Sequence, residues 1–494
     1  MIHGKKGVIV FLVCLLAAAT LPAQTLTTLY SFAKTDGQKP VAPLLQGFDG
    51  KFYGTTSEGG FFNGAAGTVF QLTPTGTLTT VHTFCTENTP TDCADGAGPQ
   101  AGLVQAANGR LYGTTWQGGT GAGTVFEIAS GKLTTLYNFC SLSGCTDGAA
   151  PYDTLVQTIR GDFYGTTPGG GTNGPNDGTV FKITASGALT TLYSFCSQGT
   201  YPNCTDGYFP YAGLVQGTVG DFFGTTLYGG TADDGTVFRI TASGTLTTLH
   251  SFCSQSGCTD GTNPYGGLVQ GADGDLYGTT TYGGVHGSGT VFKITPSGAL
   301  TTLYSFCSQG SPCRDGGGPR AALVQATDGN FYGVTDDCGG CGSNAGTIFK
   351  ITPSGALTTL YIFCTAGAPC TDGGDPVAAL IQATDGNFYG TTQSGGFADG
   401  FDAYGTVFRF SVGLAPFVKT LPTSGTVGAL VIILGNNLTG ATSVTLNGSA
   451  AAFTVNSSGT AISTTVPAGA TSGTVRVVTP SGMLSSNVPF RVLP

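Results

Sequence analysis

The stretch Leu26-Thr27-Thr28-Leu29-Tyr30-Ser31-Phe32 decides the fold, because it recurs along the chain from a displaced starting position. Close copies begin at Leu78, Leu133, Leu189, Leu246, Leu300 and Leu357. Each copy ends a unit of about 55 residues, but the seventh unit ends at Phe410 without one. If each unit is a four-stranded sheet, residues 26–32 must supply the missing strand of the last sheet. The displacement therefore predicts a closed ring.

The fifth unit illustrates how four strands follow from apolar alternation and turn residues. The segments 267–270, 276–280, 289–295 and 300–306 have the pattern of short β-strands. Asp273-Gly274 is typical of a two-residue hairpin turn. Seven such units predict an all-β protein, a seven-bladed β-propeller of four-stranded blades whose last blade is closed by the N-terminal strand. An open solenoid is the alternative, although it has no use for a displaced strand.

The composition fits a turn-rich β protein and argues against nucleic acid as a partner. The chain has 494 residues, including 83 Gly, and only 9% of its residues are charged. Its formal net charge is -9, and its 18 basic residues are too few to form a stripe that neutralises a phosphate backbone. A hydrophobic content of 40% is enough to build a large core.

The N-terminus predicts export. Residues 1–24 have the pattern of a signal peptide, with Lys5 and Lys6 before an apolar run from Val8 to Ala19. No later segment has the roughly 20 apolar residues of a transmembrane helix, so we expect no membrane span in the mature chain. We expect a secreted protein, either extracellular or at the cell surface. Lipid attachment at Cys14 is the weaker alternative.

The cysteines agree with export. Twelve of them form local pairs after the repeated Phe: Cys85 and Cys93, Cys140 and Cys145, Cys196 and Cys204, Cys253 and Cys258, Cys307 and Cys313, Cys364 and Cys370. Their spacing varies, which a disulfide across a surface loop tolerates better than a metal site does. We predict six disulfides here and a seventh between Cys338 and Cys341, for which a redox motif is the alternative.

The repeated strings resemble a known family. Asp-Gly-x-x-Pro, Leu-Val-Gln, Tyr-Gly-Thr-Thr and Gly-Thr-Val-Phe, together with the opening stretch, are similar to the GloVer (Gloeo_Verruco) tandem repeats of exported bacterial proteins, over residues 25–412. That resemblance implies no established enzymatic activity. Residues 415–494 instead resemble an IPT/TIG domain, an immunoglobulin-like β-sandwich common in cell-surface proteins. The matching segments are 422–425, 431–438, 466–470 and 475–482.

Two polar residues recur in every unit. A Gln ends each first strand: Gln46, Gln105, Gln157, Gln216, Gln270, Gln325 and Gln382. We expect these amides to satisfy backbone groups between neighbouring blades, with a polar axial channel as the alternative. An Asp precedes Gly before each first strand: Asp36, Asp95, Asp147, Asp206, Asp260, Asp315 and Asp372. We expect it to cap a turn, because one carboxylate is too few for a calcium shell of six to eight oxygens.

Variable loops indicate where a ligand would bind. In a four-stranded blade, the loop after the second strand and the loop between blades open on the same face, and here both vary in length. Binding residues concentrate on such loops. Tyr152, Tyr211 and Tyr265 each follow the repeated Pro, and Arg320 takes that position in the next unit. The glycine-rich loops add Trp116, Tyr228, Tyr282, Phe61, Phe62, Phe397, Phe401 and Tyr404. Exposed aromatics suit stacking on sugar rings or gripping a peptide, and covering the core is the alternative role.

No catalytic constellation is evident. His82 and His250 replace the repeated Tyr of a fourth strand and are expected to be structural, whereas His286 lies in a variable loop. Asp153 stands where most units have a small residue, near the expected axial opening. We expect a secreted, non-catalytic recognition or adhesion protein for polysaccharide or a surface protein, without cofactor or metal. A carbohydrate-active enzyme (a glycoside hydrolase or lyase) and a structural surface-layer or matrix component are the alternatives.

Overall fold

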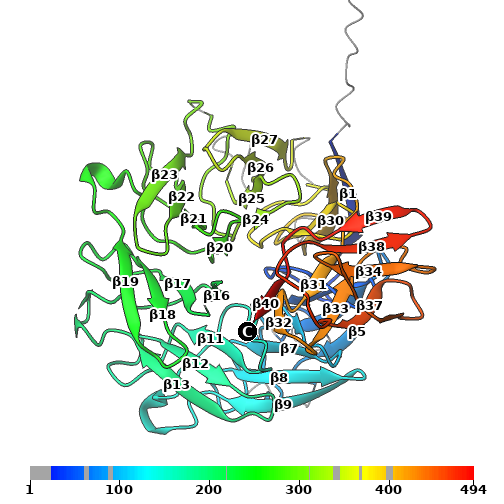
Figure 1. Ribbon diagram of the computed structural model, residues 1–494. Helices are drawn as coiled ribbons and strands as arrows, with labels where there is room; N and C mark the ends of the chain where they lie inside the picture. Colours follow the sequence, from blue (N-terminus) through cyan, green and yellow to red (C-terminus); the bar gives the residue numbers. More distant parts are fainter. Residues whose placement is uncertain are drawn as a thin grey trace, which may run out of the picture.

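The protein is all-β in the computed structural model, which describes residues 24–60, 66–86, 93–218, 220–310, 312–337, 345–365, 370–396 and 404–493. Within these residues the only helical elements are two short 3-10 turns, η1 (Ser143–Cys145) and η2 (Ser256–Cys258). Figure 1 shows four-stranded sheets set radially around a common centre, which gives the chain a propeller-like arrangement.

Each unit of the repeat forms one antiparallel four-stranded sheet, numbered here in chain order. Sheets 1 to 3 consist of β2 (Leu45–Gln46), β3 (Phe52–Thr56), β4 (Thr68–Leu72) and β5 (Leu78–Thr83); β6 (Val104–Gln105), β7 (Leu111–Thr115), β8 (Thr124–Ala129) and β9 (Lys132–Asn138); and β10 (Val156–Gln157), β11 (Phe163–Thr167), β12 (Thr179–Ile183) and β13 (Leu189–Ser194). Within each sheet the strands lie in sequence order, as hairpin connections require.

Sheets 4 to 6 repeat this arrangement. They consist of β16 (Val215–Gln216), β17 (Phe222–Thr226), β18 (Thr236–Ile240) and β19 (Leu246–Ser251); β20 (Val269–Gln270), β21 (Leu276–Thr280), β22 (Thr290–Ile294) and β23 (Leu300–Ser305); and β24 (Val324–Gln325), β25 (Phe331–Thr335), β26 (Thr347–Ile351) and β27 (Leu357–Ile362). The short ribbon of β14 (Gly199–Thr200) and β15 (Asn203–Cys204) lies between sheets 3 and 4 in the sequence. In the fifth unit each predicted strand is present, and three of the four are shorter than expected by one or two residues.

Sheet 7 takes its fourth strand from the start of the chain. It has the order β1 (Thr25–Ser31), β30 (Thr406–Ser411), β29 (Phe388–Thr392) and β28 (Ile381–Gln382). The pairing is antiparallel and runs from Thr25 opposite Ser411 to Ser31 opposite Thr406. The displaced stretch therefore completes the last sheet, as its position in the sequence predicts.

The core lies between successive sheets. The Val and Phe of the third strands are fully buried, as Val237 and Phe238 illustrate at 0% exposure. Aromatic rings from neighbouring sheets stack against one another, for example Tyr164 on Phe222, with ring centroids 4.2 Å apart. The Tyr-Gly-Thr-Thr glycines face the Phe of the third strand, and a Cβ on Gly224 would lie 2.6 Å from the Phe238 ring. Both repeated strings thus serve the packing between sheets.

A separate unit follows the ring. One sheet has the order β31 (Lys419–Leu421), β33 (Leu430–Leu434), β37 (Ala461–Thr465) and β36 (Phe453–Val455), and the other β35 (Ser449–Ala450), β34 (Ser443–Leu446), β38 (Val475–Thr479) and β39 (Gly482–Ser485). Two further strands, β32 (Ser424–Thr426) and β40 (Arg491–Leu493), pair in parallel. Ile433 and Ile462 of the first sheet pack with Val444 and Val477 of the second in one apolar core, which makes this unit a sandwich.

The sandwich contacts the face that carries the short turns between first and second strands, called here the turn face (Figure 1). The Phe48 ring packs with Leu434 of β33 and Ala461 of β37. Its carbonyl oxygen accepts hydrogen bonds from Asn456 Nδ2 at 2.9 Å and Thr460 Oγ1 at 2.7 Å. The opposite face, which carries the variable loops and is called here the loop face, makes none of these contacts.

Among the described residues, no helix is long and apolar enough to cross a membrane.

Candidate ligand-binding face

A left-handed backbone residue positions each loop between sheets. The residue before the repeated Pro has a positive φ in all seven units: Lys39, Gly98, Ala150, Phe209, Asn263, Gly318 and Asp375. In every unit this loop forms an isolated β-bridge with the loop after the second strand, as Ala97 does with Gln117. In the first unit the bridge joins Gln38 to Glu58. A left-handed residue other than Gly is held only where the surroundings enforce it. The turn is therefore a fixed part of each sheet.

This turn directs the residue after each Pro toward the centre of the ring. All seven such residues line one cavity of about 300 Å³: Val41, Gln100, Tyr152, Tyr211, Tyr265, Arg320 and Val377. The cavity opens on the loop face, because the loops between sheets lie there. The four candidates that follow the repeated Pro, Tyr152, Tyr211, Tyr265 and Arg320, thus meet at the axial mouth.

The four candidates contact one another in sequence order. The ring centroids of Tyr152 and Tyr211 are 4.4 Å apart, and those of Tyr211 and Tyr265 are 4.9 Å apart. The Arg320 guanidinium carbon lies 5.9 Å from the Tyr265 centroid, within the range of a cation–π contact. Arg320 also pairs with Asp336 at 2.8 Å. Burial is the main cause that raises the pKa of both Tyr211 and Tyr265, so both stay neutral at physiological pH.

Asp153 lies next to this cluster and also lines the cavity. Its carboxylate accepts hydrogen bonds from the backbone N–H groups of Thr154 and Gly213, both at 2.6 Å. Burial raises its pKa, although these two hydrogen bonds oppose the shift. The described part of the chain contains no cationic side chain in an ion pair with Asp153.

Asp153 also interrupts a hydrogen bond that other units share. Thr55 and Thr166 donate to the carbonyl oxygens of Ala101 and Ala212, the Asp153 equivalents of the following sheets, at 2.9 and 3.0 Å. The corresponding hydroxyl of Thr114 is buried and has no hydrogen-bond partner among the described residues. The repeat symmetry is therefore broken next to the one carboxylate at this position.

Of the candidates from the glycine-rich loops, Trp116, Tyr228 and Tyr282 are exposed, Tyr404 packs against the core, and only Tyr228 joins the axial group. Its ring stacks on Tyr208 at 5.5 Å and meets Phe209 edge-on at 5.9 Å. Trp116 is 36% exposed and lies beside Gly98, and Tyr282 is 52% exposed. Neither of these two has a ring contact with the axial cluster among the described residues.

Three aromatics that the repeat pattern does not indicate, Tyr201, Tyr208 and Phe209, form a group with Tyr228 and connect it to the axis. Tyr201 contacts Tyr208 at 5.3 Å, Tyr208 contacts Phe209 at 5.9 Å, and Phe209 stacks on Tyr211 at 6.3 Å. A connected row of rings, called here the aromatic strip, therefore leads to the cavity, and one of its members, Tyr208, is buried at 4% exposure. Its members are Tyr201, Tyr208, Tyr228, Phe209, Tyr211, Tyr152 and Tyr265. The signal that could have found it was the aromatic-rich run Tyr208-Phe209-Pro210-Tyr211.

The repeated Asp and Gln have structural partners. Asp206, for example, accepts hydrogen bonds from the Tyr193 hydroxyl and from Ser197 and Gln198 N–H groups, so it caps the cystine loop. The two histidines that replace the repeated Tyr make the same contact, as His250 does to Asp260 at 3.1 Å. The Gln Oε1 atoms accept hydrogen bonds from backbone N–H groups of a neighbouring sheet. For example, the Thr218 N–H donates to Gln270 Oε1 at 3.1 Å. These amides thus link sheets, as expected.

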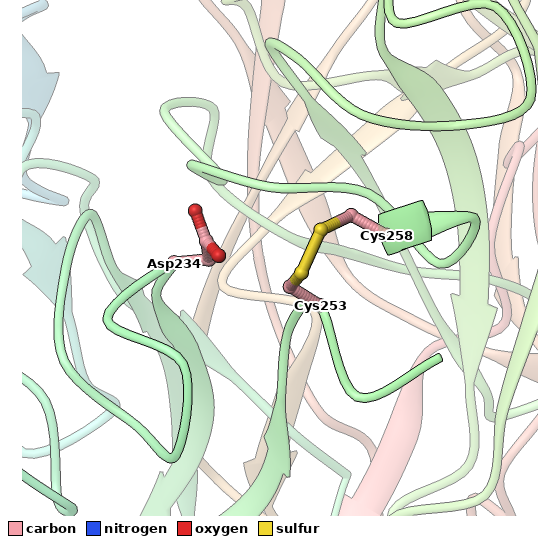
Figure 2. Close-up of side chains that lie close together, drawn as sticks. All are labelled: Asp234, Cys253 and Cys258. Atoms are coloured by element: carbon pink, nitrogen blue, oxygen red, sulfur yellow. A yellow bond between two sulfur atoms is a disulfide. The ribbon is translucent and has the colours of Figure 1, made fainter. Parts of the chain in front are cut away.

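All six predicted loop disulfides are present. They join Cys85 to Cys93, Cys140 to Cys145, Cys196 to Cys204, Cys253 to Cys258, Cys307 to Cys313 and Cys364 to Cys370. Figure 2 shows Asp234 beside the Cys253–Cys258 disulfide, with the three potential ligand atoms within 4.8 Å of one another. Because the two sulfurs are bonded to each other, this group is not a thiolate metal site. Disulfides in this number indicate an oxidising, extracellular environment.

Several predicted residues lie outside the described part of the chain. They are Cys14, Phe61, Phe62, Cys338, Cys341, Phe397 and Phe401. The first 23 residues, which include most of the predicted signal peptide, also lie outside it.

Comparison with known sequences decides the family. The chain matches the Gloeobacter/Verrucomicrobia repeat in five overlapping segments, residues 15–158, 91–259, 141–340, 199–399 and 312–480. It belongs to this family. The Gloeobacter/Verrucomicrobia repeat thus corresponds to the sheets described above, and the family resemblance of the sequence is confirmed. A comparison with curated proteins found no match.

Three solved structures with some likeness to this Gloeobacter/Verrucomicrobia repeat protein are distant from it. A fungal alcohol oxidase of the AA5 family, in complex with copper, is 14% identical with a TM-score of 0.49, covering 95% of this chain and 99% of its own. A protein from Lactobacillus plantarum is 17% identical with a TM-score of 0.43, covering 70% and 95% respectively. A Bacteroides uniformis protein, provisionally assigned as a 6-phosphogluconolactonase, is 16% identical with a TM-score of 0.41, covering 70% and 95%. At these values no activity carries over to this chain.

Proposed function

We propose that this protein is a secreted, non-catalytic recognition or adhesion protein whose loop face binds a polysaccharide. The observation that supports this function is the aromatic strip. Its outer members, Tyr201 and Tyr228, are 64% and 37% exposed, and its inner members line the cavity. Aromatic faces supply apolar area at a low cost in side-chain entropy, and their hydroxyl groups can hydrogen-bond sugars. A row of rings suits a linear chain of sugar units better than a compact ligand.

The scaffold in this proposal is a closed seven-bladed β-propeller followed by an IPT/TIG domain. The seven four-stranded sheets and the pairing of β1 with β30 support the propeller. The two packed sheets of the C-terminal unit support an immunoglobulin-like domain. In this view residues 1–24 are removed on export, and the mature chain begins with the strand that closes the ring.

The C-terminal sandwich serves as a spacer in this proposal. Its contacts with Phe48, and the 3.1 Å hydrogen bond from Thr384 Oγ1 to Asn436 Oδ1, lie on the turn face. A sandwich fixed there leaves the loop face open to ligand. A cell-surface attachment through the sandwich would therefore present the strip outward.

Binding of the purified chain, residues 25–494, to an array of glycans and cell-wall polymers tests this function. Specific capture should be lost when Tyr201 and Tyr228 are both changed to Ala. The matched control is Tyr282→Ala, because Tyr282 is 52% exposed on the same face but lies outside the strip. Capture that survives the double substitution would refute the strip as the binding site. Capture of surface proteins but of no glycan would refute polysaccharide as the ligand.

A further inference from the structure

The axial cavity contains one acidic side chain that lacks a cationic partner within the described part of the chain, and although burial raises the pKa of Asp153, a cationic group bound beside it would favour its ionised form. Asp153 lines it and has no cationic partner among the described residues, and its hydrogen bonds come from the backbone N–H groups of Thr154 and Gly213 and from the Thr154 side chain. The cavity's one cation, Arg320, already pairs with Asp336 at 2.8 Å. The equivalent position in the other sheets holds Ala or Gly, so the charge is particular to this site. A ligand that enters here meets one carboxyl group without a cationic partner among the described residues.

The tyrosine rings around Asp153 also favour a positively charged ligand. Tyr152, Tyr211 and Tyr265 line the cavity next to Asp153, and each ring has a negative face that attracts cations. An anionic group would be repelled by the carboxylate, and a neutral one would gain nothing from its charge. Tyrosine faces beside a carboxylate are therefore suited to an organic ammonium group.

The size and position of the cavity limit the ligand further. Its volume of about 300 Å³ is at the lower end for small-molecule sites, so it accommodates a single ring rather than a branched group. The aromatic strip leads to it from the outer part of the loop face. A polymer lying on the strip would place one of its units at the axial mouth.

We propose that the axial cavity binds an amine-bearing sugar unit of a polysaccharide, with Asp153 holding the ammonium group and the three tyrosines contacting the ring. This inference rests on the proposed function, since it names the class of polysaccharide that the loop face takes. It makes the preferred ligand a cationic glycan, such as one of glucosamine units without N-acetyl groups.

Calorimetry with two oligosaccharides of equal length tests the inference. A tetramer of β-1,4-linked glucosamine should bind about tenfold more tightly than the N-acetylated tetramer at pH 6, the preference expected of one cation–π and carboxylate site. Asp153→Asn should abolish this preference, because the affinity for the glucosamine tetramer falls to that for the acetylated tetramer. Asp275→Asn, which removes a carboxylate from the turn face, is the matched control and should keep the preference.

Each result decides a different part of the inference. Equal affinity for the two tetramers in the wild type would overturn the amine site and leave the proposed polysaccharide function intact. A preference that survives Asp153→Asn would overturn the role of Asp153. Absence of binding to any glycan by a folded chain would overturn both proposals. If the Asn variant does not fold, Asp153→Ala provides the second test, because Ala stands at the equivalent position in five other sheets, as Ala212 does in sheet 4.

Discussion

The side-chain amide of Gln46 makes two hydrogen bonds to Thr384, which lies 338 residues later in the chain. Its Nε2 donates to the Thr384 hydroxyl, and its Oε1 accepts the Thr384 backbone N–H, both at 3.0 Å. Sheet 1 is thus joined to sheet 7 on the turn face. Together with the pairing of β1 and β30, this contact holds the two ends of the repeat array together.

Gln46→Ala should therefore destabilise the closure of the ring. Thr384 is fully buried, so its backbone N–H would lose its acceptor without access to water, which costs about 1–3 kcal/mol, while its hydroxyl would keep its bond to Asn436. Urea unfolding measures the loss, and amide hydrogen exchange should be faster in β1 and β30. Gln157→Ala is the matched control, because Gln157 makes no such hydrogen bond in the described structure. Equal effects of the two substitutions would contradict a special role for the junction between sheets 1 and 7.

The repeated Asp should matter for stability without calcium. Both carboxylate oxygens of Asp206 accept hydrogen bonds, including 2.7 Å from the Tyr193 hydroxyl and 2.9 Å from the Ser197 N–H, and the residue is 0% exposed. Asp206→Ala should cost about 3 kcal/mol, since several buried donors lose their acceptor. The Tm of the wild type should be the same in EDTA and in millimolar calcium. A fall in Tm on chelation would show that the carboxylate binds a metal ion instead.

The disulfides should contribute unequally. Cys204 is fully buried and packs with Cys196 and Tyr208, whereas Cys140 and Cys145 are half-buried. Replacing either pair by Ser should remove about 2.5 kcal/mol of loop-closure stabilisation. The Cys196 and Cys204 variant should lose more than this, because two hydroxyl groups would also be placed in an apolar cluster. Thermal unfolding of the two double variants compares them directly, and equal losses would contradict the packing argument.

Asp336 should give the protein a distinct pH dependence. Burial raises its pKa to about 6 from the usual 3.8, although the Arg320 guanidinium opposes the shift. The folded state therefore holds a proton on Asp336 between these two values, while the unfolded state does not. The free energy of unfolding should fall by at most about 3 kcal/mol as the pH rises from 3.8 to about 6. Above this window the contribution of Asp336 should no longer change with pH.

Urea unfolding at several pH values between 4 and 7 measures this dependence. Asp336→Asn should flatten the fall between pH 4 and 6, because Asn does not titrate. Asp162→Asn, a substitution on the turn face, should keep the slope of the wild type. A wild type whose unfolding free energy does not change over this window would show that Asp336 titrates near its usual value.

The regular features were predictable because they repeat. A strand that is hard to assign in one unit is supported by the same pattern in the other six. The four strands, the paired cysteines and the closing stretch at residues 26–32 could therefore be predicted from alternation and spacing. The contribution of Tyr152, Tyr211, Tyr265 and Arg320 to one site was also predictable, because equal positions in a ring must face the same axis.

The departures from the repeat were harder to interpret. The loop that carries Tyr201 and Phe209 is as long as the loop between Phe84 and Pro99, where Pro90 and Gly98 stand at these positions. Nothing in the pattern of the other units therefore indicates that the two rings would join one row. Phe48 is the only aromatic at its position in the seven units, which was a signal for a contact on the turn face. Sequence alone could not show its partner, because Leu434 and Ala461 belong to another domain with a pattern of its own.

The pairing of Thr25 with Ser411 has a consequence for how the molecule is made. A chain still emerging from the ribosome has its first strand ready long before the partner of that strand exists. Until the last repeat arrives, the growing array has an unpaired edge at each end, and such edges invite proteolysis or aggregation. Only a full-length chain can bury both edges. A prematurely terminated copy would lack the pairing between β1 and β30, and we expect proteases to digest it faster than the chain whose two ends are joined.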